Sequence, residues 1–260
     1  MDGLAEEAEK SPKSTKDIYL AGGCFWGTEH YFKQMEGVLA TEVGFANGHT
    51  ENPSYKEVYT DTTGYVETVH VRYNSQVVSL GFLLKMFFKA IDPTSLNKQG
   101  HDEGTRYRTG VYYTDPEDLP VIEKAFSEEQ KNYQQPLAVE KLPLQNFYTA
   151  EEYHQDYLDK NPDGYCHLPD SLFEFARQTR RISQMEQRLN RVTTFMKQHP
   201  STLDKSVQDD IAALEKYYGS DEWRKDFADD EAGLLPDGLK RGVLSEDAIW
   251  NLLSEAKQLK

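Results

Sequence analysis

A cysteine flanked by glycines, in the pentapeptide GCFWG at residues 23–27, follows directly after the apolar run at 18–21. Glycines destabilise helices and strands, so they are best explained where the backbone turns tightly or a ligand approaches closely. We therefore expect the chain to turn here from a strand into a helix that begins at Phe25. Cys24 would then lie at a helix N-terminus, where the helix dipole and unpaired N–H groups lower the pKa of a thiol. The alternative, that Cys24 is a small buried hydrophobic residue, stays open.

The segments after this turn predict further strands and helices. β-Branched and aromatic residues are enriched at 38–45 and 65–73, as is typical of strands. Residues 79–91 are helix-like and apolar on almost all sides, which indicates a helix buried against a sheet. The expected elements are a strand at 17–21, a helix at 25–35, strands at 38–45 and 65–73, a helix at 79–91, a strand at 108–113 and a helix at 116–133. This order is that of a split βαβ unit, so the predicted fold class is α+β, with helices packed on a mixed sheet.

Irregular segments between these elements hold candidate functional positions. A loop rich in Gly, Asn and Pro at residues 46–64 is long enough to be functional or disordered, and 94–105 is a second irregular stretch. The sequence TAEE at 149–152 is a capping box, which predicts a helix that carries His154. The loop after it contains Cys166, which a loop position makes mobile enough to reach another site, although a partly buried structural thiol fits its local sequence equally well.

The composition of the chain changes beyond about residue 178. Apolar residues recur there at spacings of three and four positions on both sides of Pro200, which predicts two antiparallel helices. Ser220 and Ser245 precede acidic first turns as N-caps, so two more helices are expected at 221–229 and 246–259. The expected parts of the chain are a disordered tail over residues 1–16, a main domain over residues 17–177 and a helical accessory domain over residues 178–260.

Charge and cysteine content exclude several classes of protein. The net charge of −15 and the pI of about 4.9 argue against nucleic acid or a membrane surface as a partner, because both require a basic face. No apolar stretch approaches the roughly 20 residues of a membrane span. Cys24 and Cys166 are the two cysteines, which excludes a disulfide-rich secreted fold and any paired metal-binding motif. We expect a cytoplasmic protein without a bound metal.

Five segments in a single order resemble the methionine sulfoxide reductase A family, over about residues 17–177. They are GCFWG, the loop sequence GHTENPSYKEV, GYVE around Glu67, QGHDEGTRYRTG, and AEEYHQDYL followed by NPDGYC. The resemblance implies an α+β sandwich built on a ferredoxin-like split βαβ core, which agrees with the element order above. It also implies a thiol-dependent reduction of methionine S-sulfoxide, free or in proteins, to methionine.

The resemblance implies a catalytic role for three residues. Cys24 corresponds to the nucleophile that attacks the sulfoxide sulfur, and only a thiolate is reactive enough. Glu67 corresponds to the acid that protonates the leaving oxygen, which at neutral pH requires burial to raise its pKa. Cys166 corresponds to the resolving cysteine, which condenses with the Cys24 sulfenic acid to a disulfide that thioredoxin reduces. No bound metal or organic cofactor is implied.

The resemblance also implies a substrate pocket. Phe25 and Trp26 correspond to the aromatic pair that cradles the methyl group of the sulfoxide. Tyr55 and Tyr107 correspond to the tyrosines whose hydroxyls hold its oxygen, and Asp102 belongs to the same polar site. Such a pocket selects one epimer, which in the family is the S form. One departure is GYVE where many members have GHAE, which changes the surroundings of the acid.

Residues 178–260 look like a helical domain of undefined function that is appended to some bacterial reductases, which favours a bacterial origin. Two alternatives to a reductase remain open in the sequence. One is a cysteine hydrolase in which Cys24 acts with a histidine base. Its candidate bases are His30, His49, His70 and His154. The other is a module that binds oxidised methionine or a partner helix without reaction. We expect the appended helices to pack on each other, which makes the protein a monomer.

Overall fold

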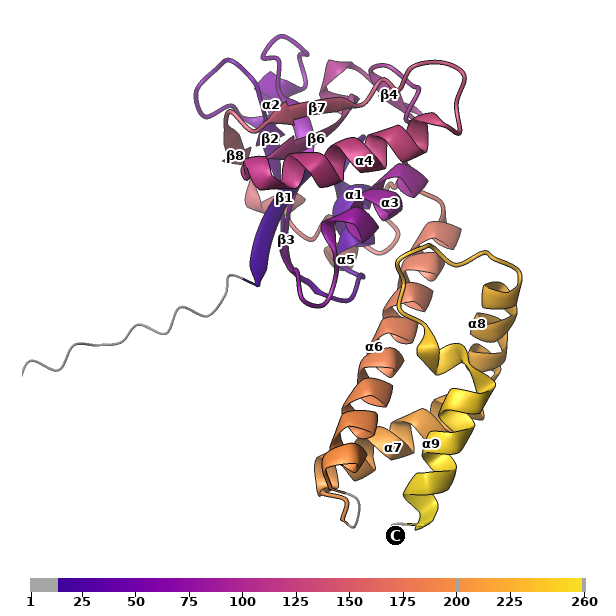
Figure 1. Cartoon of the computed structure of the whole chain (residues 1–260). Coiled ribbons are helices and arrows are strands. Elements are labelled where there is room, and N and C mark those ends of the chain that lie inside the picture. The colour runs from indigo at the N-terminus through magenta and orange to yellow at the C-terminus, as the bar shows by residue number, and fades with distance from the viewer. Residues whose placement is uncertain (1–13, 200–201, 259–260) are drawn as a thin grey trace, which may run out of the picture. The chain divides into compact units, whose positions relative to one another are not determined.

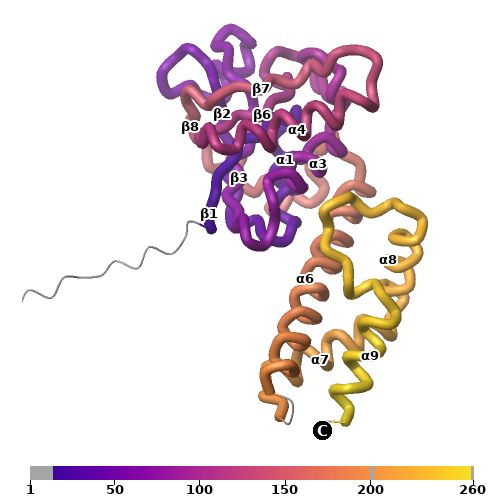
Figure 2. The backbone as a smooth tube through the Cα atoms, viewed as in Figure 1, coloured from indigo at the N-terminus to yellow at the C-terminus, as the bar shows by residue number. Residues whose placement is uncertain are grey.

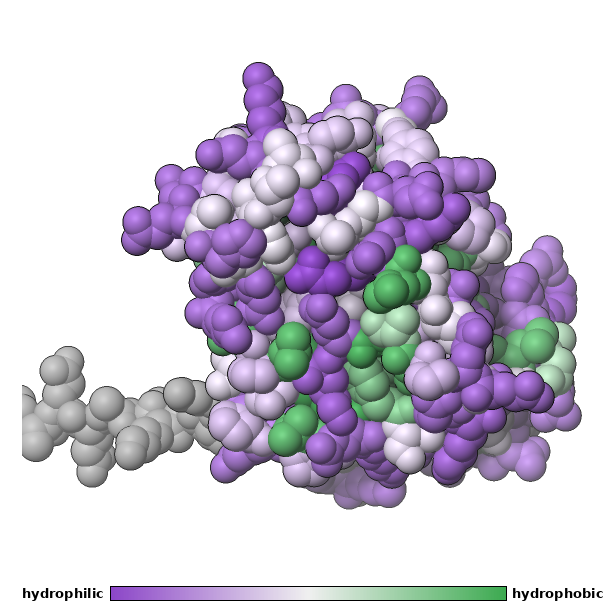
Figure 3. Space-filling model, turned by 90° about the horizontal axis from the view of Figure 1, so that it is seen from above, coloured by the Kyte–Doolittle hydropathy of each residue, from purple (hydrophilic) through white to green (hydrophobic). Residues whose placement is uncertain are grey.

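The computed structural model describes residues 14–199 and 202–258, which form two compact units (Figure 1). The first unit ends at Leu168, except that residues 34–36 group with the second unit, which continues from Pro169. No helix within these described stretches is both long and apolar enough to cross a membrane. In the view of Figure 3 hydrophilic residues predominate on the surface, and the hydrophobic ones lie in small groups.

A six-stranded sheet forms the centre of the first unit, in the order β7-β6-β1-β3-β2-β8. Its strands are β1 Thr15–Gly22, β2 Val38–Ala46, β3 Val66–Asn74, β6 Thr109–Tyr113, β7 Glu140–Pro143 and β8 Phe147–Thr149. Neighbouring strands are antiparallel except β6 and β7, which are parallel. The predicted α+β class with a mixed sheet is therefore confirmed. Strands β7 and β8 were not predicted, because strands this short show no periodicity.

The first strand begins earlier than the sequence predicts. Residues 1–13 of the expected tail lie outside the described residues, but Thr15 and Lys16 already pair with Asn74 and Tyr73 of β3. The partner strand lies more than 50 positions further along the chain, so the local sequence around Lys16 does not show this pairing.

Three helices of the first unit lie where the sequence predicts them. They are α1 Phe25–Phe32, α3 Leu80–Ala90 and α4 Leu119–Gln130, the last preceded by a 3-10 turn at Pro116–Asp118. Helix α3 contacts both β1 and α4, and α4 runs beside it in Figure 2. Because α3 lies between the sheet and α4, its sequence is apolar on almost all sides. Leu83 and Phe87 are fully buried, and each such side chain stabilises the fold by about 1.5–3 kcal/mol.

The loop at 46–64 contains one short helix. Helix α2, Tyr55–Val58, is opened by a capping box in which the Glu57 carboxylate accepts a hydrogen bond from the Ser54 backbone N–H at 2.7 Å. The hydroxyl of Ser54 in turn accepts from the backbone N–H of Glu57. The capping box orders this end of the loop and thereby fixes the backbone of Tyr55.

The second irregular stretch, 94–105, contains a small hairpin. It consists of β4 Lys98–Gln99 and β5 Asp102–Glu103, and a 3-10 turn at Thr105–Tyr107 follows it. The Gln99 side chain anchors the hairpin, because it accepts from the backbone N–H of Asp92 and donates to the carbonyl of the same residue at 2.9 and 2.8 Å.

The helix predicted from the capping box at 149–152 is not formed. A 3-10 turn at Glu152–His154 and the single-turn helix α5 Tyr157–Lys160 follow β8 instead. Glu151, at the N-cap position of the 3-10 turn, makes no capping hydrogen bond, and its carboxylate accepts from the backbone N–H of Tyr55 at 2.9 Å.

Hydrogen bonds to other elements explain why this helix breaks. The Gln155 side chain bonds the backbone N–H and C=O of Val43 in β2, at 2.9 and 2.8 Å. Asp156 takes a left-handed φ of 52°, and its N–H donates to the buried Glu29 carboxylate of α1 at 2.9 Å. These partners lie more than 100 positions away, so the tertiary fold overrides the local helix signal.

The second unit is helical, as the sequence predicts. Its elements are α6 Asp170–Gln198, α7 Lys205–Tyr218, α8 Asp221–Glu231, a 3-10 turn at Gly242–Leu244 and α9 Glu246–Gln258. The side chain of Ser220 caps α8 as expected. Helix α6 begins before residue 178, so the domain boundary expected from composition falls inside this helix.

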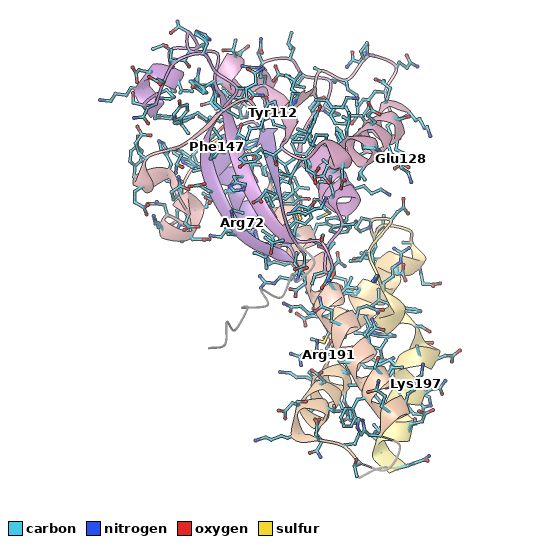
Figure 4. All side chains as sticks on the ribbon, turned by 60° about the vertical axis from the view of Figure 1, so that its left-hand side comes forward. Arg72, Tyr112, Glu128, Phe147, Arg191 and Lys197 are labelled. Carbon is cyan, nitrogen blue, oxygen red and sulfur yellow. The ribbon has the colours of Figure 1, made fainter. Side chains whose placement is uncertain are left out.

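Buried acids of the second unit are paired with arginines. Asp226 of α8 is completely buried and accepts from the Arg181 guanidinium at 2.6 and 2.9 Å and from the Tyr217 hydroxyl at 2.6 Å. Asp210 of α7 accepts from Arg191, which is labelled on α6 in Figure 4, at 2.8 and 2.9 Å. These pairs connect α6 to α7 and α8.

Candidate active site

Cys24 lies at the N-cap of α1, directly after β1. Gly23 before it has a φ of +86°, and a Cβ added there would lie 2.7 Å from the Cβ of Gln99. The Thr28 hydroxyl closes the turn by bonding the carbonyls of Gly22 and Cys24 at 3.3 and 3.2 Å. The expected turn from strand to helix is therefore confirmed, and its first glycine is required by both backbone conformation and space.

The environment of Cys24 corrects the expectation of a lowered thiol pKa. The residue is only 5% exposed, and burial raises the pKa of the Cys24 thiol well above its ordinary value, with the nearby Glu67 charge as the next cause. The backbone N–H of Trp26 acts in the opposite direction but is outweighed. The helix N-terminus was predicted correctly, whereas the desolvation that opposes its effect is not visible in the sequence.

Glu67 is buried beside this turn. It belongs to β3, is 1% exposed, and its carboxylate accepts from the backbone N–H of Phe25, the first residue of α1, at 3.0 Å. Burial raises the pKa of Glu67 to about 8, against the smaller lowering by that hydrogen bond. The Glu67 side chain is therefore protonated at neutral pH, and a protonated carboxyl carries no charge that would oppose ionisation of the Cys24 thiol.

Two tyrosines share the surroundings of Glu67. Burial raises the pKa values of Tyr55 and Tyr107, and for both the Glu67 charge is the second cause. Arg106 lies over the Tyr107 ring at 4.4 Å, and its Nη1 donates to Asp61 at 2.6 Å. Both tyrosine hydroxyls are thus neutral hydrogen-bond donors near the carboxyl of Glu67. Arg106 was not predicted, because an arginine in a polar, irregular segment gives no sign of its burial.

Aromatic rings form one side of the site. Phe25 is buried and lies 6.5 Å from Tyr55, measured between ring centroids. Trp26 stacks on Tyr157 at 3.8 Å, and its indole N–H donates to Nδ1 of His154 at 3.0 Å. Burial lowers the pKa of His154 to about 4. His154 is thus a neutral acceptor that orients the indole, and Tyr157 is a second contact that the sequence did not reveal.

Asp102 of β5 lies close to Cys24. Its Oδ1 accepts from the Tyr165 hydroxyl at 3.0 Å, and its buried Oδ2 has no hydrogen-bond partner among the described residues. Donor atoms of Cys24, Asp102 and His167 lie within 4.8 Å of one another. Ligands on one tetrahedral zinc ion are about 3.5 Å apart, so these groups would have to move closer to hold an ion.

Cys166 lies against the other glycine of the pentapeptide. A Cβ added to Gly27 would lie 2.8 Å from the Cys166 sulfur and 3.2 Å from Nδ1 of His167. The backbone N–H of Leu168 donates to the Cys166 sulfur at 3.4 Å, and both cysteines are thiols in this structure. The structure thus brings together Cys24 and Cys166, which are 142 positions apart. It also explains the second glycine, because a side chain there would displace Cys166.

Comparison with known proteins identifies the family of this chain. The family model for peptide methionine sulfoxide reductase matches residues 16–187, and a second model, a domain of unknown function (DUF4298), matches residues 182–260. The chain belongs to the peptide methionine sulfoxide reductase family. It is 55% identical over 159 residues to the peptide methionine sulfoxide reductase MsrA of Clostridium acetobutylicum, and 52% identical over 162 residues to that of Lachnoclostridium phytofermentans. These alignments cover 61% and 62% of this chain and 98% of each relative.

Solved structures lead to the same family. Reduced Mxr1 from Saccharomyces cerevisiae is 42% identical, with a TM-score of 0.57, over 60% of this chain and 90% of that one. Methionine sulfoxide reductase A of Corynebacterium diphtheriae is 36% identical, with a TM-score of 0.54, over 60% of this chain and 79% of that one.

Membership of the family defines the reaction. The protein is a peptide-methionine (S)-S-oxide reductase, an oxidoreductase that converts methionine sulfoxide to methionine by cysteine chemistry. The cysteine hydrolase and the non-catalytic binding module are therefore set aside. Three of the four histidines named as possible bases are engaged elsewhere, because Nδ1 of His154 accepts from the Trp26 indole and His30 and His70 bond Asp159 and Asp17.

Proposed function

We propose that Cys24 is the nucleophile and Glu67 the acid of this reductase. Glu67 gives its proton to the sulfoxide oxygen while the Cys24 sulfur attacks the sulfoxide sulfur. The oxygen passes to Cys24 as a sulfenic acid, methionine leaves, and the thiol proton restores Glu67. The observation that carries the proposal is the 3.0 Å hydrogen bond from the Phe25 N–H, which holds a buried, protonated Glu67 against the residue that follows Cys24.

We propose that Phe25, Trp26, Tyr55, Tyr107 and Asp102 bind the sulfoxide. The two neutral tyrosine hydroxyls would donate to its oxygen, and the rings of Phe25 and Trp26 would receive its methyl group. The shared Glu67 environment of the tyrosines supports their common role. Asp102 has one buried carboxylate oxygen without a hydrogen-bond partner among the described residues, which supports its role in binding the sulfoxide.

We propose that Cys166 resolves the sulfenic acid as a Cys24–Cys166 disulfide, and that thioredoxin reduces this disulfide. The Cys166 sulfur packs against Gly27, three residues after Cys24, and, after burial, Cys166 is among the groups that raise the pKa of the Cys24 thiol, which supports the pairing. The cycle then needs an external dithiol and no bound metal or organic cofactor. A disulfide that is reduced in every cycle fits a reducing compartment, so we include a cytoplasmic location in the proposal. We also include a monomeric state, because the appended helices pack on each other.

We propose a ferredoxin-like class for the core of the first unit. Its four central strands have the order β6-β1-β3-β2, with α1 between β1 and β2 and α3 between β3 and β6. We also propose a catalytic domain that begins with β1, which already includes Thr15 and Lys16, and a helical accessory domain that is divided from it within α6. The family matches, which overlap at residues 182–187, support a division in this region.

A thioredoxin-coupled assay on the two epimers of methionine sulfoxide tests these assignments. We expect turnover of the S epimer only, and none with Cys24→Ser. Cys166→Ser should release one equivalent of methionine and then stop, because the sulfenic acid forms but is not resolved. Multiple turnovers by Cys166→Ser with thioredoxin as the only reductant would contradict the resolving role.

A further inference from the structure

His167 follows the proposed resolving cysteine and has no part in the chemistry described so far. One ring nitrogen lies within 4.8 Å of the Cys24 sulfur. Its Nε2 bonds the carbonyl of Gly22 at 3.0 Å. Because a carbonyl oxygen only accepts, Nε2 carries the ring proton and Nδ1 is left with a lone pair.

The free lone pair at Nδ1 is buried and unused. Nδ1 has no hydrogen-bond partner in the part of the chain that the structure describes. Burial lowers the pKa of His167, against the smaller raising effects of the Gly22 carbonyl and of Asp102. The ring is therefore neutral at pH 7 and able to accept a proton. A buried polar atom without a hydrogen-bond partner destabilises the fold, and a catalytic role is one reason for a protein to keep such an atom.

Both glycines of the pentapeptide make room for this ring. A Cβ on Gly23 would lie 3.2 Å from Nε2, and a Cβ on Gly27 would lie 3.2 Å from Nδ1. The imidazole therefore extends across the turn that holds Cys24. The same point at Gly27 lies 2.8 Å from the Cys166 sulfur, so Nδ1 and that sulfur face the same side of α1.

We propose that His167 is the general base of the disulfide-forming step, which itself rests on the proposed function. Nδ1 takes the proton of the Cys166 thiol, and the thiolate attacks the sulfur of the Cys24 sulfenic acid. The S–S bond forms as the S–O bond breaks, and the proton on His167 passes to the leaving oxygen to give water. Cys166 is oxidised and Cys24 is reduced, so no further reactant is needed.

The groups around His167 fit this step. The charged or titratable groups that face it are Asp102 of β5 and the two thiols. Asp102 is held by the Tyr165 hydroxyl at 3.0 Å and stabilises a transient imidazolium. The N–H of Leu168, which bonds the Cys166 sulfur at 3.4 Å, stabilises the thiolate.

The test is His167→Gln, which keeps an N–H donor near the Gly22 carbonyl but has no basic nitrogen. Full-length protein, reduced beforehand, is mixed with a slight excess of methionine S-sulfoxide and quenched at short times. Methionine is measured by chromatography, and the disulfide by intact mass after thiol alkylation. His101→Gln, the same change at an exposed histidine, is the matched control.

We expect methionine release by His167→Gln within about twofold of wild type, and disulfide formation at least tenfold slower at pH 7. The difference in disulfide-forming rate between the variant and wild type should narrow at about pH 9.5, because hydroxide can then remove the thiol proton without a protein base. Disulfide formation at the wild-type rate would overturn the role of His167, as would a delay of equal size at both pH values, which indicates mere misplacement of Cys166. If wild type itself releases no methionine, the proposed function fails instead.

Discussion

Each of the two units contains a buried carboxyl group, and the surroundings of these two groups, Glu67 and Asp226, differ. In the second unit, Asp226 is completely buried and accepts from the guanidinium of Arg181 and the hydroxyl of Tyr217. In the first unit, Glu67 is also buried, and it accepts a hydrogen bond from the backbone N–H of Phe25 instead of from a charged side chain. Burial raises the pKa of Glu67 to about 8, whereas Arg191 lowers that of Asp210 in the second unit.

This difference separates structural from chemical use of the same side-chain type. A paired carboxylate stays ionised and joins elements, because its partners compensate for the loss of water. An unpaired buried carboxyl keeps its proton and can donate it. Asp102 and His167 each have a buried polar atom without a hydrogen-bond partner among the described residues, and both lie in the same unit as Glu67, within the residues that the reductase family model matches.

Removal of the acidic proton from Glu67 should give the largest effect. Glu67→Gln keeps the shape and an acceptor for the Phe25 N–H, but it supplies no acidic proton. We expect methionine release at pH 7 to slow by roughly 10²–10⁴-fold, the usual contribution of general acid catalysis, in a single-turnover quench experiment. A loss of less than about threefold would show that another group protonates the oxygen.

The corresponding change in the second unit should affect stability instead. Asp226→Asn removes the nearer of the two carboxylates that pair with the Arg181 guanidinium, and breaking such a buried pair costs about 3 kcal/mol. Hydrogen exchange over residues 170–258 should accelerate accordingly, while single-turnover methionine release stays within twofold of wild type. Unchanged exchange in α6 and α8 would mean that this pair does not stabilise the unit.

A smaller effect is expected from the space around the second glycine of the pentapeptide. Gly27→Ala places a methyl group 2.8 Å from the Cys166 sulfur, and such overpacking costs about 1–3 kcal/mol. We expect slower disulfide formation, measured by intact mass, with methionine release affected less. Gly219→Ala is the control, because the nearest atom to its added Cβ is 3.6 Å away. Equal rates for both variants would remove the packing argument.

The smallest effect concerns Asp210, whose partners Arg188 and Arg191 are partly exposed. Asp210→Asn should lower the unfolding free energy of the second unit by about 1 kcal/mol at pH 7. The folded pKa of Asp210 is lowered, so its contribution is present above the unfolded value of 3.8 and is lost as pH falls below it. Urea unfolding should therefore show a smaller difference between wild type and Asp210→Asn at pH 3 than at pH 7. The same difference at both pH values would contradict the prediction.

The sequence predicts the strand-turn-helix around Cys24 because its glycines and apolar residues are local. Prediction from the sequence fails where contacts between residues far apart in the chain determine the structure or the pKa. The pKa of the Cys24 thiol depends on its burial by residues that are distant in the sequence. The helix predicted from the capping box at 149–152 does not form, because Gln155 and Asp156 make hydrogen bonds to Val43 and Glu29 instead. His167 bonds the carbonyl of Gly22, 145 positions away, so no local pattern reveals that its ring lies near the Cys24 sulfur.

The protonation state of Glu67 tests the central claim most directly. Its folded pKa is raised, so neutral Glu67 stabilises the fold below its ordinary value of 4.5, and this stabilisation is lost as pH rises through about 8. The infrared spectrum of wild type minus that of Glu67→Gln isolates this one carboxyl group. We predict a protonated carboxyl band at pH 7 that disappears as pH rises through about 8. A carboxylate band already complete at pH 6 would contradict the account.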